Sequence, residues 1–262
     1  MKKFFLILTL TLNTSLLNAR FLSNITDWFS GTQHETDSSK HMLTDKENHV
    51  KVVNFTGDIE IKTWNKNEVL LETTKSGTID DLEETRIDVK NTKTGLVIKT
   101  IEQSTGACRV DYSLIIPKRC SIDIQTEKGN ITISNVTQPI TAKTYKGSIK
   151  INGAKTIKAE TKYGNIDIEA ADLKKSDKVL AFSTKGNVKL SIPENTNATL
   201  YAKTSRGKVT TEQKVLLKDV STEISNKALA SLRKDIQGSL GNTEGCEVRL
   251  YTDFGNVKVQ RA

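Results

Sequence analysis

Apolar and polar residues alternate with period two through most of the chain from residue 50 onward. The alternating runs are short and bounded by Gly and Asn, which predicts β-strands joined by tight turns. After residue 120 the runs come in pairs, one on each side of a glycine. Together with one earlier position, these glycines are assigned as structural turn residues: Gly57, Gly129, Gly147, Gly164, Gly186, Gly207 and Gly255.

The six later glycines share a motif, seen in Thr126-Glu-Lys-Gly-Asn-Ile, with Thr or Ser three residues before the glycine. Glycine reaches positive φ without steric cost, so the chain can reverse sharply there. The hydroxyl can hydrogen-bond the turn backbone, and the recurring Asn after the glycine can stack into a side-chain ladder. Successive glycines from Gly129 to Gly207 lie 18, 17, 22 and 21 residues apart, which is typical of solenoid coils.

Each of the six later glycines is flanked by apolar positions that are two residues apart on both sides, except that only Val209 follows Gly207. Because side chains alternate across a strand, both members of a pair point to the same face. Stacked coils would therefore gather these pairs into one aliphatic core. The pairs before the glycines begin at Ile122, Ile140, Ile157, Val179, Leu200 and Val248, and the positions after them begin at Ile131, Ile149, Ile166, Val188, Val209 and Val257.

The N-terminus predicts export. Residues 1–19 have the form of a signal peptide, with Lys2 and Lys3, an apolar run and a cleavage site at Leu17-Asn18-Ala19. An uncleaved anchor is the alternative, and no later stretch is apolar enough to span a bilayer. We therefore expect an extracytoplasmic bacterial protein, in the periplasm, at the cell surface or secreted, with no transmembrane segment after signal removal.

The mature chain divides into a leader and one domain. Residues 20–49 are polar and predict a flexible leader, and residues 50–262 predict the β-solenoid. An irregular insertion, residues 212–245, breaks the rhythm. There the four-residue spacing from Val220 to Ile236 permits a short helix, and strands are the alternative. Residues 80–84 are expected to form an acidic loop or one helical turn.

Charge suggests one candidate surface. The formal net charge of +8 falls to +6 without the signal peptide, which favours polyanions over neutral partners. The residue directly before the glycine is basic in four coils and aromatic in two, Tyr163 and Phe254. We predict a polyanion-binding ladder there, and the alternative is that these side chains only provide solubility. The ladder consists of Lys128, Lys146, Lys185 and Arg206.

No motif for catalysis, metal binding or a cofactor stands out. The outward columns, for example Asp123, Thr141 and Lys158, do not collect the carboxylates that acid–base or calcium chemistry requires. The three histidines lack metal-site spacing. Cys108 and Cys120 flank one predicted strand, too far apart to bond each other, and no disulfide is assigned. We therefore expect neither enzyme activity, nor a cofactor, nor a metal.

The chain resembles the bacterial putative-adhesin family of β-strand repeat proteins, also catalogued as a domain of unknown function. The resemblance rests on the segments beginning at Val53 and Asp111, the Thr-x-x-Gly-Asn-Ile units, and the closing segment from Gly238. It spans roughly residue 50 to the C-terminus. It implies a right-handed, single-stranded β-helix or β-solenoid of coils of about 17–22 residues in an exported or envelope protein.

The predicted function is therefore an exported, non-catalytic β-solenoid that acts as an adhesin-like or structural surface-binding module. Its partner would be an anionic glycan or envelope surface, with no specific nucleic acid. The alternative is an envelope sensor or scaffold that binds an envelope protein through the leader. A third, polysaccharide-acting β-helix enzyme would need clustered acids that the columns lack.

Overall fold

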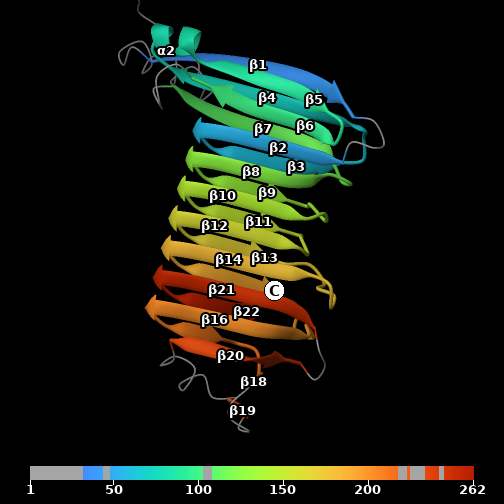
Figure 1. The fold of residues 1–262 in the computed structure, drawn as a ribbon, viewed down its shortest axis with the longest axis vertical. Coiled ribbons are helices and arrows are strands. Elements are labelled where there is room, and N and C mark those ends of the chain that lie inside the picture. Colours follow the sequence, from blue (N-terminus) through green and yellow to red (C-terminus); the bar gives the residue numbers. More distant parts are fainter. Residues whose placement is uncertain (1–31, 44–47, 103–107, 218–222, 225–233, 242–244) are drawn as a thin grey trace, which may run out of the picture.

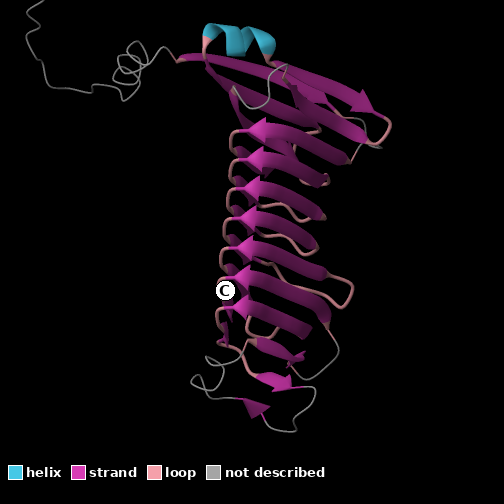
Figure 2. Ribbon diagram, turned by 60° about the vertical axis from the view of Figure 1, so that its left-hand side comes forward, coloured by secondary structure: helices cyan, strands magenta, loops and turns pink. Residues whose placement is uncertain are grey.

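The computed structural model describes residues 32–43, 48–102, 108–217, 223–224, 234–241 and 245–262. The fold of these described residues is all-β, as predicted, with two large sheets and one short helix, α2 (Ile79–Glu84). The sheets run along the long axis of the molecule, with their strands stacked like rungs (Figures 1 and 2). Helix α2 confirms the helical turn that is one of the two predictions for residues 80–84. Thr78 caps it in a capping box with Asp81.

Sheet A has ten strands. In spatial order they are β1 (Gln33–Met42), β4 (Glu68–Gly77), β7 (Arg109–Pro117), β3 (Ile59–Trp64), β9 (Ile131–Ser134), β11 (Ile149–Asn152), β13 (Ile166–Glu169), β15 (Val188–Ile192), β22 (Val257–Arg261) and β17 (Val209–Thr211). From β7 to β17 all neighbours are parallel, whereas β1 and β4 are antiparallel additions at one end.

Sheet B has twelve strands. In spatial order they are β19 (Glu223–Ile224), β18 (Val215–Leu217), β20 (Asp235–Leu240), β16 (Ala198–Arg206), β21 (Cys246–Phe254), β14 (Lys178–Lys185), β12 (Ile157–Tyr163), β10 (Ile140–Lys146), β8 (Ser121–Lys128), β2 (His49–Thr56), β6 (Gly95–Ile101) and β5 (Arg86–Thr92). The strands from β16 to β6 are parallel.

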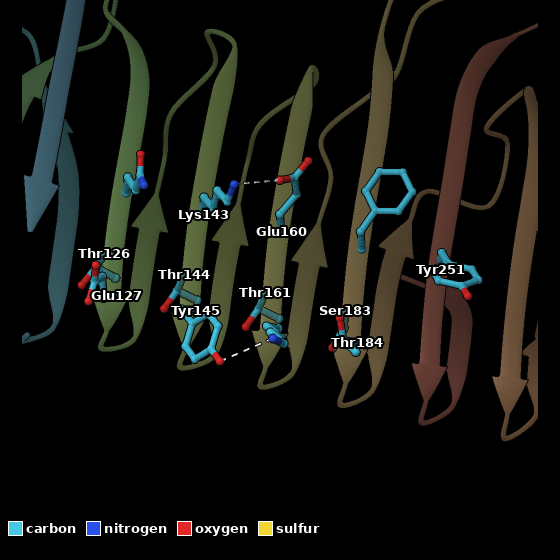
Figure 3. Close-up of a pocket in the computed structure, with 13 residues that line it drawn as sticks. Thr126, Glu127, Lys143, Thr144, Tyr145, Glu160, Thr161, Ser183, Thr184 and Tyr251 are labelled. Carbon is cyan, nitrogen blue, oxygen red and sulfur yellow. Dashed lines mark hydrogen bonds and ion pairs between the residues drawn. The ribbon is translucent and has the colours of Figure 1, made fainter. Parts of the chain in front are cut away.

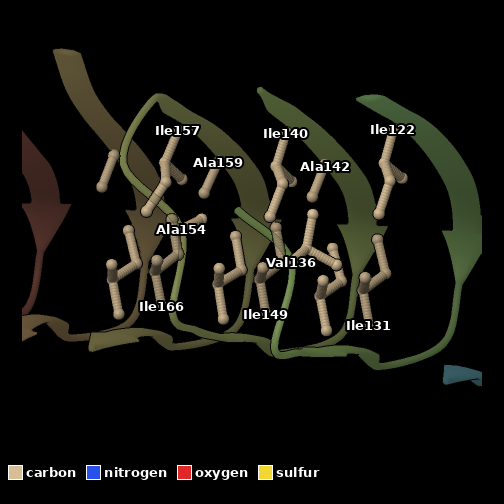
Figure 4. Packing of buried hydrophobic residues seen from close by; sticks show 14 of the residues in the cluster. Ile122, Ile131, Val136, Ile140, Ala142, Ile149, Ala154, Ile157, Ala159 and Ile166 are labelled. Carbon is tan, nitrogen blue, oxygen red and sulfur yellow. The ribbon is translucent and has the colours of Figure 1, made fainter. Parts of the chain in front are cut away.

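The core lies between the two sheets. Each glycine motif places one strand in sheet B before the turn and one in sheet A after it. The predicted apolar pairs are buried: Ile140 and Ile149, for example, are 2% and 1% exposed. Figure 4 shows Ile122, Ile140 and Ile157 in a row facing Ile131, Ile149 and Ile166. The space between the two sheets is narrow, and Ile, Val and Ala fill it because large side chains of one sheet pack beside small ones of the other.

The strand pairs do not stack in chain order, contrary to our expectation that Gly255 would close the series. The pair β21/β22, which carries Gly255, lies between β14/β15 and the earlier pair β16/β17. Likewise β2/β3 separates β8/β9 from β6 and β7. Hydrophobic periodicity marks which residues are buried in a strand, but it carries no information about which strand lies beside it.

The structure also differs from the predicted flexible leader. Residues 33–42 form β1, which pairs with β4 along its whole length, and His49 already begins β2. Strand β1 is the edge of sheet A and nearly all of its side chains are exposed. An edge strand needs only backbone hydrogen bonds to its neighbour, so it shows no apolar alternation for a sequence pattern to detect. Residues 20–31 and 44–47 of the leader lie outside the described residues.

The insertion 212–245 contributes strands where the structure describes it. Ile224 lies in β19 and Ile236 in β20, which pairs antiparallel with β16 and β18. The strand alternative therefore holds at these two positions. The other positions of the predicted helix, Val220, Ala228 and Leu232, lie outside the described residues.

One polar network crosses the core near Gly57. The Tyr112 hydroxyl donates to Thr100 Oγ1 at 2.7 Å, Thr100 donates to Asn54 Oδ1 at 2.7 Å, and Asn54 Nδ2 donates to the Val110 carbonyl at 2.8 Å. The three side chains are 2–4% exposed. Burial raises the pKa of Tyr112 to about 12, because the phenolate would lose its hydration there.

Alkaline pH should therefore destabilise the fold through Tyr112. A raised pKa in the folded state means that the contribution to stability is complete below the unfolded pKa of 10.0 and declines as the pH rises toward about 12. The loss should amount to about 2–3 kcal/mol. Denaturant unfolding of the wild type and of Tyr112→Phe across this window measures it. As the pH rises through this window, the unfolding free energy of the wild type should fall relative to that of the variant. A difference between the two proteins that stays constant with pH would contradict the raised pKa of Tyr112.

Candidate functional site

The turns between sheet B and sheet A form one continuous edge of the molecule. Gly147 shows how it is built: its φ is +156°, and a Cβ at this position would lie 1.9 Å from the carbonyl oxygen of Gly129 in the neighbouring turn. The Gly147 N–H donates to the Tyr163 carbonyl at 2.9 Å. Gly129, Gly164, Gly186 and Gly255 have the same contacts with their neighbours. Glycine is therefore required by close backbone approach as well as by φ.

The hydroxyl side chains three residues before the glycines are buried, with exposures of 0–5%. Five of the six donate to the glycine carbonyl of the adjacent turn over 2.8–3.1 Å, as Thr161 does to Gly147. Thr126 instead donates to the Phe55 carbonyl at 3.4 Å. The acceptor is turn backbone, as predicted, and it belongs to the neighbouring turn in the stack. The inter-turn bond is favoured because it satisfies a buried carbonyl between two stacked turns, which would otherwise cost free energy.

Side chains directly after the glycines connect the turns a second time. The Asn130, Asn165, Asn187 and Asn256 side-chain oxygens each accept from the backbone N–H of the next turn, at 2.7–3.0 Å. The predicted asparagine ladder thus exists, with side chain-to-backbone bonds as its rungs. Both sets of bonds hold the turns at the strand spacing of about 4.8 Å.

The predicted basic ladder lies on this edge, and the structure changes its order. Register partners run Lys128, Lys146, Tyr163, Lys185, Phe254, Arg206. Because β21 is inserted between β14 and β16, Phe254 lies between Lys185 and Arg206. Basic and aromatic side chains therefore alternate from Lys146 to Arg206, which the chain order does not show.

Contacts within the ladder are cation–π contacts. Lys185 Nζ lies 5.4 Å from the Tyr163 ring centroid and 5.7 Å from that of Phe254, and Arg206 Cζ lies 5.0 Å from Phe254. Among the described residues, none of the four basic members has an acidic partner within ion-pair distance. Two outward lysines of sheet A differ, since Lys189 pairs with Asp167 at 3.2 Å and Lys258 with Glu212 at 3.0 Å. The ladder is thus a line of uncompensated positive charge.

Beside the ladder, the outer face of sheet B is hollowed. This sheet B hollow has a volume of about 730 Å³ and crosses five strands, from β8 through β10, β12 and β14 to β21. Figure 3 shows Tyr145 and Tyr251 on different strands of the hollow, with Lys143 and Glu160 on the strands between β8 and β14. The hollow was not predicted. Its signal in the sequence lies in the columns two and four residues before each glycine, which hold Tyr145, Phe182 and Tyr251.

The three cysteines are free and buried, so none bonds another. Cys108 and Cys120 lie beyond the two ends of β7. Burial raises the pKa of all three thiols, that of Cys246 to about 11. They are therefore protonated core side chains at neutral pH, because burial outweighs the opposing effect of Arg119 on the pKa of Cys120 and of Lys75 on that of Cys108. The described residues hold no group of His, Cys, Asp and Glu arranged to bind a metal, and no described helix is long and apolar enough to span a membrane.

Comparisons with known proteins find similar folds among solved structures. No protein-family model matches the sequence, and no curated protein matches it. Among solved structures, a putative cell adhesion protein from Clostridium sporogenes is similar at a TM-score of 0.56 and 10% identity, covering 88% of this chain and 100% of that one. A putative adhesin from Bacteroides fragilis is similar at a TM-score of 0.40 and 10% identity, covering 87% and 97%.

At 10% identity the Clostridium structure shows that the two chains share a fold, and it transfers no residue roles. The function therefore has to be argued from this chain's own surfaces.

Proposed function

We propose that the chain is a non-catalytic surface-binding module that attaches to polyanionic surfaces through the basic ladder. Its motif-bearing strand pairs are the coils of a right-handed β-solenoid, and the protein works outside the cytoplasm after loss of residues 1–19. The observation that carries the proposal is the line of basic side chains, free of acidic partners, along the stacked turns. The name of the Clostridium neighbour, a putative cell adhesion protein, is consistent with this role.

The ladder suits a linear polyanion for geometric reasons. Lys128 and Lys146 are one strand spacing of about 4.8 Å apart. From Lys146 to Arg206 the basic side chains are two strands apart, with Tyr163 and Phe254 between them, so an extended acidic polymer meets a positive charge at every second strand there. The turns are locked by the inter-turn hydrogen bonds, and the cation–π contacts restrain Lys185 and Arg206. Little conformational entropy is then lost on binding, and many weak contacts add up to avidity.

Reversing the charge of Lys128, Lys146, Lys185 and Arg206 to Glu should weaken binding to immobilised dextran sulfate on the order of tenfold or more at low salt. The wild type should lose affinity as salt rises, whereas the variant should respond weakly. Biolayer interferometry with uncharged dextran as the reference surface measures both.

A matched variant separates the ladder from net charge. Lys93, Lys118, Lys150 and Lys174 are exposed and lie away from the stacked turns. Reversing these four gives the same net charge. This protein should keep most of the affinity for dextran sulfate. Equal losses in the two variants would mean that overall charge alone causes binding, and the proposed function would then be wrong.

A further inference from the structure

Aromatic side chains gather on one sheet. The described residues contain nine, of which seven belong to sheet B. Five of these project from its outer face and two, Tyr163 and Phe254, lie between basic side chains of the ladder. Of the other two, Tyr112 is buried in the core and Trp64 ends β3 in sheet A. The five on the outer face are Phe55, Tyr145, Phe182, Tyr201 and Tyr251. Such a one-sided distribution is not needed for the core, because none of the five lies between the sheets.

The sheet B hollow contains three of these five rings. Phe182 and Tyr251 are register partners on adjacent strands, and Tyr145 lies two strands from Phe182, across β12. Neighbouring contacts restrain Tyr145: its ring meets that of Tyr163 edge to face at 5.5 Å, and Lys162 Nζ lies 4.9 Å from its centroid. The Tyr251 hydroxyl donates to Asp253 Oδ1 and lies 3.2 Å from Ser205 Oγ. Two of the rings are thus held in place before any ligand arrives.

Charges in the hollow cancel, unlike those in the ladder. Its lining carries two acidic residues, Glu127 and Glu160, and two basic residues, Lys143 and Lys162. Glu160 is compensated by Lys158 at 3.0 Å and by Lys143 at 3.9 Å. A polyanion or polycation gains nothing from such a surface. A neutral ligand that offers hydroxyls finds both donors and acceptors beside the rings.

We propose that the sheet B hollow binds uncharged hexopyranose units of a glycan chain. A pyranose ring has a C–H face that packs on the π face of Tyr or Phe and a rim of hydroxyls that hydrogen-bond charged and amide side chains. An open hollow across five strands suits a chain of sugar units that enters and leaves it. A lipid tail instead needs an enclosed apolar cavity, and nucleic acid needs net positive charge. This proposal goes beyond the ladder function and does not depend on it.

The test is binding to an array of uncharged glycans, followed by titration calorimetry with the best hexasaccharide. We expect the wild type to bind hexopyranose glycans, and the double variant Phe182→Ala/Tyr251→Ala to lose about tenfold or more in affinity. Both side chains lie on the outer face, so the core stays intact, which thermal unfolding checks. Tyr201→Ala is the matched control, because Tyr201 projects from the same face outside the hollow, and its affinity should be unchanged.

The proposals for the ladder and for the hollow can be disproved independently of each other. Glycan binding should persist at high salt and in the basic-ladder charge-reversal variant, whereas dextran sulfate binding should persist in the Phe182/Tyr251 variant. The inference is overturned if the array retains no uncharged glycan, or if the double variant binds as tightly as the wild type. It is also overturned if high salt abolishes glycan binding, or if neutral phosphatidylcholine vesicles compete for the hollow.

Discussion

Gly147→Ala should destabilise the whole stack by more than about 4 kcal/mol. A Cβ at Gly147 would lie 1.9 Å from the Gly129 carbonyl oxygen, so the two turns must move apart. That displacement breaks the bonds that join these two turns, from Thr144 Oγ1 to the Gly129 carbonyl and from the Gly129 N–H to the Lys146 carbonyl. The loss is therefore larger than the strain of one residue at positive φ, which is about 1–3 kcal/mol.

Gly153→Ala is the control for this substitution. Gly153 also has positive φ, +88°, but the nearest atom to its added Cβ would be 3.5 Å away. It should cost only about 1–2 kcal/mol, the usual penalty for a left-handed residue with a side chain. Urea unfolding of both variants measures the difference. Similar losses would show that close approach of the turns contributes little to stability.

Removing residues 246–262 should unfold strands that come earlier in the chain. Because β21/β22 lies inside the stack, its removal leaves β16 and β17 without their parallel neighbours. The buried side chains of these strands, Leu200, Ala202 and Val209, would then lose the packing that β21 and β22 provide. If the strand pairs followed chain order, the same truncation would only shorten the stack at its end.

Hydrogen exchange read by mass spectrometry distinguishes the two outcomes. In the truncated protein, amides of 198–211 should exchange close to the rate of an unfolded chain, while 121–169 stays protected. The full-length chain is the reference, in which both segments are protected. Continued protection of 198–211 after truncation would contradict the observed strand order.

The repeating core could be predicted from the sequence because its signal is local. Ile149 and Ile151 follow the turn glycine Gly147 at fixed offsets, and alternation alone places them on one face. Strand β1 could not be predicted, since an exposed edge strand is specified by backbone pairing with β4. The position of β21 between β14 and β16 could not be predicted either, because parallel strands with the same motif pair equally well with several neighbours.

For the basic ladder, the sequence predicts which residues lie at the turns, but it does not predict their order along the stack. All four basic-ladder residues lie at stacked turns, as their shared offset from the glycine indicates. The alternation with Tyr163 and Phe254 depends on the inserted strand pair, so only the structure reveals it. The hollow depends on side chains from five strands, and its rings are spread over residues 145–251.

Lysine footprinting tests the central claim, that the stacked turns of this module are its polyanion-binding edge. The native protein is acetylated with a limiting reagent in the presence and absence of dextran sulfate, and modified peptides are quantified by mass spectrometry. We predict protection of Lys128, Lys146 and Lys185, with no change at Lys93, Lys118, Lys150 and Lys174. Equal protection at both sets, or protection confined to the second, would contradict the claim.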